Sequence, residues 1–119
     1  MGRTNPNFLN GVPELLVLRL LSRKEMYGYE LVREIRLSTK EGVSFGEGCI
    51  YPLLHSLEKD GILASHRKEV NGRERYYYRL SAKGTKRFEK LTADWIKIQR
   101  GVSVALGVTY ERPAAIQRA

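Results

Sequence analysis

The dipeptide Asn71-Gly72 constrains the fold of this chain more than any other feature of its sequence. It separates two β-prone runs, Ile62 to Val70 and Arg75 to Leu80. Asn and Gly both tolerate the positive φ angles of a two-residue hairpin turn, so this pair is the strongest short-range hairpin signal. The sequence therefore predicts a β-hairpin that turns at residues 71–72.

Three short helices are expected before the hairpin. Leucines crowd the segment that begins at Pro13, and Tyr27 to Arg36 has apolar residues on one helical face. The third helix carries apolar residues at positions i, i+3, i+4 and i+7, namely Ile50, Leu53, Leu54 and Leu57. Because Pro52 is tolerated only in or just after a first turn, this helix should begin around Glu47 to Cys49, and Gly61 should end it. Three helices followed by a hairpin is the order of a winged helix-turn-helix domain.

A long fourth helix is predicted after the hairpin, with Ser81 as its N-cap and Gly84 weakening its first turn. Its apolar residues alternate at spacings of three and four over almost three heptads, and they are Phe88, Leu91, Trp95, Ile98, Val102 and Ala105. Such a seam needs a partner, and a small domain has little surface to cover it. We therefore expect dimerisation through this helix, the alternative being that it folds back on its own core.

The predicted fold class is mostly α with a β-hairpin: a winged helix-turn-helix domain plus a long carboxyl-terminal dimerisation helix. At 119 residues the chain has room for one compact domain. The expected organisation is a flexible arm at residues 1–11, the winged-helix domain at 12–80, the dimerisation helix at 81–110 and a flexible tail at 111–119.

The net charge of +8 is unevenly distributed. Residues 1–60 have eight Lys and Arg against eight Asp and Glu, residues 61–80 five against two, and residues 81–119 eight against three. A basic excess confined to the second half suits a polyanion, either nucleic acid or an anionic membrane surface. The hairpin cations do not form one face of an amphipathic helix, so a membrane role is disfavoured. Without an apolar run of about 20 residues or a secretory signal, the expected location is the cytoplasm.

No residue set in the sequence indicates catalysis. His55, His66 and the single cysteine, Cys49, form no cluster with the spacing of metal ligands, so neither a metal nor a cofactor is expected. No nucleophile with a base and an orienting group is evident, and the chain is not predicted to be an enzyme. Cys49 is interpreted as a small semi-buried side chain, with a redox sensor as the alternative.

The third helix is the only candidate for reading DNA. A helix of this size fits the major groove, while Lys and Arg on the hairpin would neutralise phosphates beside it. The positive amino end of this helix, near Gly48 and Cys49, could also hold a phosphate. Core packing is expected for Tyr76, Tyr77 and Tyr78, with Tyr77 pointing opposite to its two neighbours.

Three groups of motifs are found at positions typical of one known family. They are Tyr27 to Leu31; Gly48 to Leu54 with Leu57 to Ile62; and Arg75 to Gly84. In these motifs the chain resembles the PadR family of transcriptional regulators from about Leu15 to Lys90. The resemblance implies a homodimer that binds a two-fold-related operator, usually as a repressor, with dimer contacts made by the carboxyl-terminal helix. A chain this short resembles the smaller subgroup of the family.

The resemblance also implies which residues contact DNA. Tyr51, Pro52 and His55 would lie on the reading helix, and the basic residues of the hairpin would lie on phosphate. The predicted DNA-binding residues are Gly48, Cys49, Tyr51, His55, Arg67, Lys68, Arg73 and Arg75.

Trp95 falls at the centre of the predicted seam. If it meets its symmetry mate, the interface either closes or leaves a cavity walled by aromatic rings, and some members of the resembled family sense flat hydrophobic molecules in such a cavity. A small planar hydrophobic effector is therefore one alternative, beside a closed structural contact. The alternative function for the whole chain is a protein-interaction adaptor whose winged helix no longer reads DNA.

Overall fold

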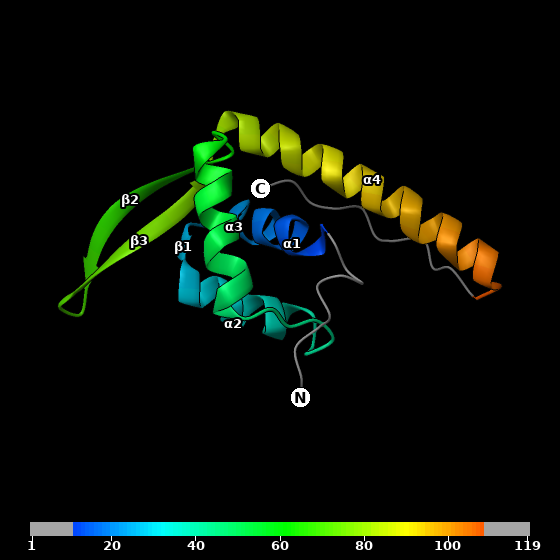
Figure 1. Cartoon of the computed structure of the whole chain (residues 1–119), viewed down its shortest axis with the longest axis horizontal. Coiled ribbons are helices and arrows are strands. Elements are labelled where there is room, and N and C mark those ends of the chain that lie inside the picture. The colour runs from blue at the N-terminus through cyan, green and yellow to red at the C-terminus, as the bar shows by residue number, and fades with distance from the viewer. Residues whose placement is uncertain (1–10, 109–119) are drawn as a thin grey trace.

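The computed structural model describes residues 11–108, which form four helices and three strands. They follow in the order α1 (Val12–Leu21), β1 (Met26–Tyr27), α2 (Gly28–Ser38), α3 (Glu47–Lys59), β2 (Leu63–Val70), β3 (Arg73–Leu80) and α4 (Ala82–Leu106). The three short helices gather at the base of the hairpin, which projects to one side, and α4 extends to the other (Figure 1). This confirms the winged helix-turn-helix architecture with a long carboxyl-terminal helix. The predicted tail and, apart from Gly11, the predicted arm lie outside the described residues.

The hairpin turns where the sequence predicts. Strands β2 and β3 pair antiparallel from Leu63 opposite Leu80 to Val70 opposite Arg73, and Asn71 and Gly72 have φ angles of 53° and 77°. A strand that was not predicted, β1, pairs with the other edge of β3, so that the sheet order is β1-β3-β2. Two residues are too few to show an alternation of polar and apolar side chains, which explains why β1 was missed.

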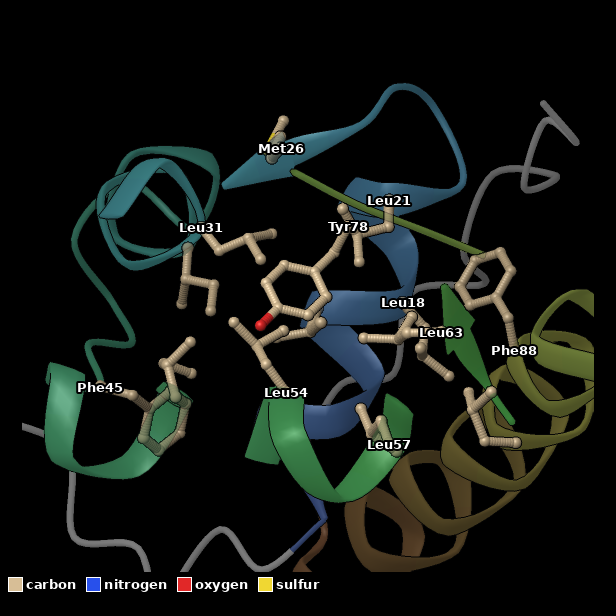
Figure 2. Packing of buried hydrophobic residues seen from close by; sticks show 14 residues of the cluster. Leu18, Leu21, Met26, Leu31, Phe45, Leu54, Leu57, Leu63, Tyr78 and Phe88 are labelled. Carbon is tan, nitrogen blue, oxygen red and sulfur yellow. The ribbon is translucent and has the colours of Figure 1, made fainter. Parts of the chain in front are cut away.

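The core lies between the helices and one face of the sheet. Its centre includes leucines of α1, α2 and α3 around the ring of Tyr78 (Figure 2). Tyr77 is buried too, on the opposite face of β3. The expectation of core packing is confirmed for Tyr78 alone, since Tyr77 is buried against Tyr27 outside this core cluster and Tyr76 is 56% exposed. Tyr76 shares the face of Tyr78 but lies two residues nearer the hairpin tip.

The junction between the hairpin and α4 depends on a close backbone approach. The Ser81 hydroxyl accepts a hydrogen bond from the Gly84 N–H at 3.0 Å, as predicted for an N-cap. A Cβ added to Gly84 would lie 2.2 Å from the carbonyl oxygen of Ile62. The sequence suggested only that Gly84 weakens the helix, whereas the structure shows that no larger residue fits against this carbonyl.

Helix α4 packs on the rest of the chain over its first turns only. Phe88 is buried, Leu91 is partly buried against the core, and the Arg87 guanidinium pairs with the Glu14 carboxylate of α1 at 2.8 Å. Farther along, Trp95, Ile98 and Val102 are 39%, 57% and 52% exposed. The alternative that the whole helix folds back on its own core is therefore wrong beyond Leu91.

Replacing Gly84 by Ala should lower the free energy of unfolding by about 1–3 kcal/mol, because the added methyl group displaces the Ile62 backbone. Gly101 of the same helix provides the control, since nothing lies within 4 Å of its Cβ position. Gly101→Ala should stabilise the protein by up to about 1 kcal/mol through helix propensity. Urea denaturation of both variants measures the difference, and equal effects would contradict the close approach.

The stability of the protein should fall at alkaline pH because of Tyr78. Burial, followed by the nearby Glu58 carboxylate, raises the pKa of Tyr78 above its usual value of 10.0. A raised folded-state pKa contributes stability that is complete below the unfolded pKa and is lost as the pH rises through the folded one. Melting temperatures from pH 8 to 11 should therefore fall more for the wild type than for Tyr78→Phe, and parallel curves would contradict this origin.

Candidate nucleic-acid interface

An open groove of about 330 Å³ lies between the amino end of α2, one face of α3 and strand β3. Side chains from all three elements line it, and most of them are aromatic or cationic. They are Tyr27, Gly28, Tyr29, Tyr51, His55, Arg73, Glu74, Arg75, Tyr76 and Tyr78. Four predicted DNA-binding residues thus meet in one place: Tyr51, His55, Arg73 and Arg75.

Helix α3 contributes Tyr51 and His55, which are one turn apart and so share a face. The Tyr51 ring lies against the backbone of Gly28, where an added Cβ would be 2.2 Å from Cε1 of the ring. Burial, reinforced by the Glu47 carboxylate, raises the pKa of Tyr51. Its hydroxyl therefore stays protonated at neutral pH and can donate a hydrogen bond, while the His55 side chain is exposed.

Strand β3 contributes two arginines in different environments. The Arg75 guanidinium lies over the Tyr27 ring, 4.2 Å from its centroid, in a cation–π contact. Arg73, directly after the turn, is exposed and forms no ion pair with any residue of the segment 11–108. Arg73 therefore keeps its full charge for an external anion, whereas Arg75 is held in place by an aromatic ring.

The predicted cations of β2 lie outside the groove, and acidic neighbours partly neutralise them. Arg67 pairs across the hairpin with Glu74 at 3.2 Å. Lys68 pairs with Glu25 at 3.4 Å and lies 5.0 Å from the centroid of the Tyr77 ring. Exposed pairs of this kind contribute about 0–1 kcal/mol, so a phosphate can replace the carboxylate at little cost.

The phosphate site expected at the amino end of α3, near Gly48 and Cys49, stays a prediction, and two features of the structure weaken it. The Cys49 N–H donates to the carbonyl of Gly46 at 3.0 Å, and Glu47 places a negative charge in the first turn. Neither Gly48 nor Cys49 lines the groove. Cys49 is semi-buried, as predicted.

Sequence reasoning missed the contribution of Tyr27, Gly28, Tyr29 and Tyr76 to this interface. The first three follow from β1, which brings the start of α2 beside the hairpin through pairing of Tyr27 with Tyr77. The only sequence signal for them was the Tyr-Gly-Tyr motif at residues 27–29, which carried the family resemblance but gave no location.

Other kinds of site have no structural support in the described part of the chain. Between residues 11 and 108, no three His, Cys, Asp or Glu side chains lie together in a way that could hold a metal ion. No helix in the same range is both long enough and apolar enough to cross a membrane.

Comparisons with known proteins agree with this architecture. A transcriptional regulator of Mycobacterium tuberculosis is 34% identical over 77 residues, which are 65% of this chain and 69% of that protein. Among solved structures, a PadR-like transcriptional regulator from Bacillus cereus has 32% identity and a TM-score of 0.72, and the match covers 84% of this chain and 96% of that one. A PadR family transcription regulator from Clostridium difficile has 27% identity and a TM-score of 0.70, with 81% and 99% covered.

The family model itself, described as the transcriptional regulator PadR-like family, matches residues 17–90. That range runs from α1 through the whole groove to the beginning of α4. It also confirms the resemblance found in the motifs of the sequence. The chain belongs to the PadR-like family of transcriptional regulators, which are not enzymes.

Proposed function

We propose that this regulator is a homodimeric, sequence-specific DNA-binding repressor that acts in the cytoplasm. In this proposal, α3 reads base edges in the major groove and the hairpin contacts phosphates beside it. The main observation in support is the groove, in which one face of α3 and two arginines of β3 lie on the same side of the molecule. A helix flanked by cations on a wing is the arrangement needed to combine base reading with phosphate contacts.

Tyr51 and His55 are the proposed base readers, because they line the groove while Ile50, Leu54 and Leu57 hold the other side of α3 in the core. Both side chains offer hydrogen-bonding groups of the kind that distinguishes base pairs in the major groove. Arg73 and Arg75 are the proposed phosphate contacts within the groove, and Arg67 and Lys68 are those outside it. Gly48 and Cys49, at the start of α3, are given a smaller role in this proposal.

Helix α4 is the proposed dimer contact. Its 25 residues make it about 37 Å long, and only its first turns touch the chain's own core. The apolar side chains left exposed, Trp95, Ile98 and Val102, lie on one face at heptad spacing with Ala105. A second copy would cover this face and place two reading helices on one duplex. Phe88 and Leu91 instead serve the chain's own packing.

Trp95 would lie against its symmetry mate in this dimer. Binding of a flat hydrophobic effector at this position stays a prediction. The intrinsic fluorescence of Trp95, the only tryptophan, reports on it directly. Quenching on addition of a planar aromatic compound, absent in the unfolded chain, would support the effector.

Selection of bound duplexes from a random DNA pool, at a stated salt concentration, tests the proposed function. Enrichment of a two-fold-related sequence is the expected result, since a symmetric dimer binds symmetric half-sites. Absence of any enriched sequence, together with binding that does not depend on salt, would contradict it and favour the protein-interaction adaptor.

Removing the exposed charge of Arg73 should weaken binding to every duplex alike. Arg73→Ala is expected to lower the slope of log affinity against log salt by about 1 without changing which sequence is preferred. The matched control is Lys86→Ala, which removes one exposed charge from α4, outside the groove. Mobility-shift titrations at several salt concentrations measure both, and equal slopes for the two variants would contradict a phosphate contact by Arg73.

A charge placed on the exposed seam of α4 should separate the protomers. Ile98→Asp is expected to give a folded monomer with strongly reduced operator affinity, because the carboxylate would be buried without a partner. Ala93→Asp places the same charge on the opposite, exposed face of the helix and should leave the dimer intact. Light scattering coupled to gel filtration measures the mass, and a dimeric Ile98→Asp protein would contradict the proposed interface.

A further inference from the structure

We propose that the dipeptide Tyr27-Gly28 is a positioning element for DNA recognition, in which Gly28 seats the reading ring Tyr51 and Tyr27 seats the wing cation Arg75. The inference rests on the proposed function and extends it to residues that contact DNA only through others. It begins with the location of the dipeptide, which joins strand β1 to helix α2 and lines the groove.

Glycine is required at position 28 because the Tyr51 ring packs against it, and not because of its own backbone conformation. It is the first residue of α2, and it is not among the glycines with positive φ, so any L-residue could adopt its conformation. A Cβ at this position would meet Tyr51 at 2.2 Å from Cε1, 2.8 Å from Cζ and 3.0 Å from Cδ1. All three contacts are with one aromatic ring. An added methyl group must therefore move the ring, and with it the hydroxyl that α3 presents to the groove.

Tyr27 holds Arg75 by a ring that is itself fixed on several sides. Its ring meets that of Tyr77 edge to face, with centroids 5.4 Å apart, and its backbone pairs with the same residue across the sheet. Its N–H donates to the Glu30 carboxylate at 3.2 Å. The Arg75 guanidinium lies 4.2 Å from the centroid of this anchored ring. The wing cation is therefore oriented by Tyr27 of β1 and not by the hairpin alone.

Two adjacent residues thus set the placement of one side chain from α3 and one from β3. Tyr51 and Arg75 line the same groove, so the two placements concern one surface. Base reading by Tyr51 and phosphate contact by Arg75 are then coupled through the same short segment. Gly28 acts on sequence preference, and Tyr27 acts on affinity for all sequences.

The first test is a double-mutant cycle between Gly28 and Tyr51. The probes are the duplex that the wild-type protein selects from a random pool and a scrambled duplex of the same composition. Gly28→Ala should reduce the affinity ratio of the two duplexes about tenfold, the size of one lost base contact. In the Tyr51→Ala background the same substitution should have no effect, because the ring that it displaces is gone.

Circular dichroism and melting temperature accompany every variant of this cycle. Alanine favours a helix more than glycine does, so Gly28→Ala should keep its helical content, and Gly28→Ala with Tyr51→Ala should melt no lower than Tyr51→Ala alone. Unchanged discrimination in Gly28→Ala, or an equal loss in both backgrounds, would overturn the positioning of Tyr51 by Gly28.

The second test compares two replacements of Tyr27. Tyr27→Phe keeps the ring under Arg75 and should bind both duplexes nearly as the wild type does. Tyr27→Leu removes the ring and should weaken both about threefold, a loss that disappears in the Arg75→Ala background. Equal behaviour of Tyr27→Phe and Tyr27→Leu would overturn the positioning of Arg75.

The variant Arg73→Ala distinguishes failure of this inference from failure of the proposed function. Within residues 11–108, neither the cation–π contact of Tyr27 nor the ring packed on Gly28 involves Arg73. If Arg73→Ala weakens binding while Gly28→Ala leaves discrimination intact, only the positioning role of Gly28 is overturned. If neither Arg73→Ala nor added salt changes binding, the DNA-binding function itself is overturned and the inference with it.

Discussion

The structure depends on β3 being the central strand of the small sheet. Its two edges bind β1 and β2, and its alternating side chains serve two sides of the molecule at once. Tyr78 points among the helices and completes the core, whereas Tyr77 points the other way, to the ring of Tyr27 and the ammonium group of Lys68. A slip of one residue in the pairing would exchange these rings and would lose the core and the groove together. The register set by the turn at Asn71-Gly72 is therefore also what places Arg73 and Arg75 beside α3.

Most of the fold could be predicted because its strongest signals are local. The positive φ angles of Asn71 and Gly72, the start of α3 at Glu47 and the Ser81 cap each follow from a few neighbouring residues. The missed features all depend on residues that are distant in sequence. Strand β1 forms only because Met26 and Tyr27 pair with Tyr78 and Tyr77 of β3. Gly84 is needed only because the Ile62 carbonyl approaches it. The same distinction applies to the groove: Tyr51 and Arg73 could be predicted from element type, whereas Tyr27 and Gly28 required the tertiary contact.

The cations of the hairpin differ in how available they are to an external anion. Glu74 and Glu25 lie within ion-pair distance of Arg67 and Lys68, and a protonated His66 would also pair with Glu25 at 3.4 Å. These pairs cost little to exchange for phosphates, so they lower the attraction of β2 for polyanions without abolishing it. The exposed Arg73 is free of such a partner within residues 11–108, and it lies next to the aromatic wall of the groove. Nonspecific attraction is thereby moderated at β2, while Arg73 lies beside the helix proposed to read bases.

The first two turns of α4 have a different task from the rest of the helix. Phe88 is buried, Arg87 binds the Glu14 carboxylate through two nitrogen atoms, and the hydrogen bond to Glu14 raises the pKa of Arg87, so this tie is charged at any physiological pH. These contacts fix the direction in which α4 leaves the winged-helix core. The exposed seam from Trp95 to Ala105 follows in the same helix, so these contacts also influence where a partner bound to the seam would lie relative to the core. In the proposed dimer, the seam decides whether two protomers associate, and the base of the helix decides how far apart their reading helices lie.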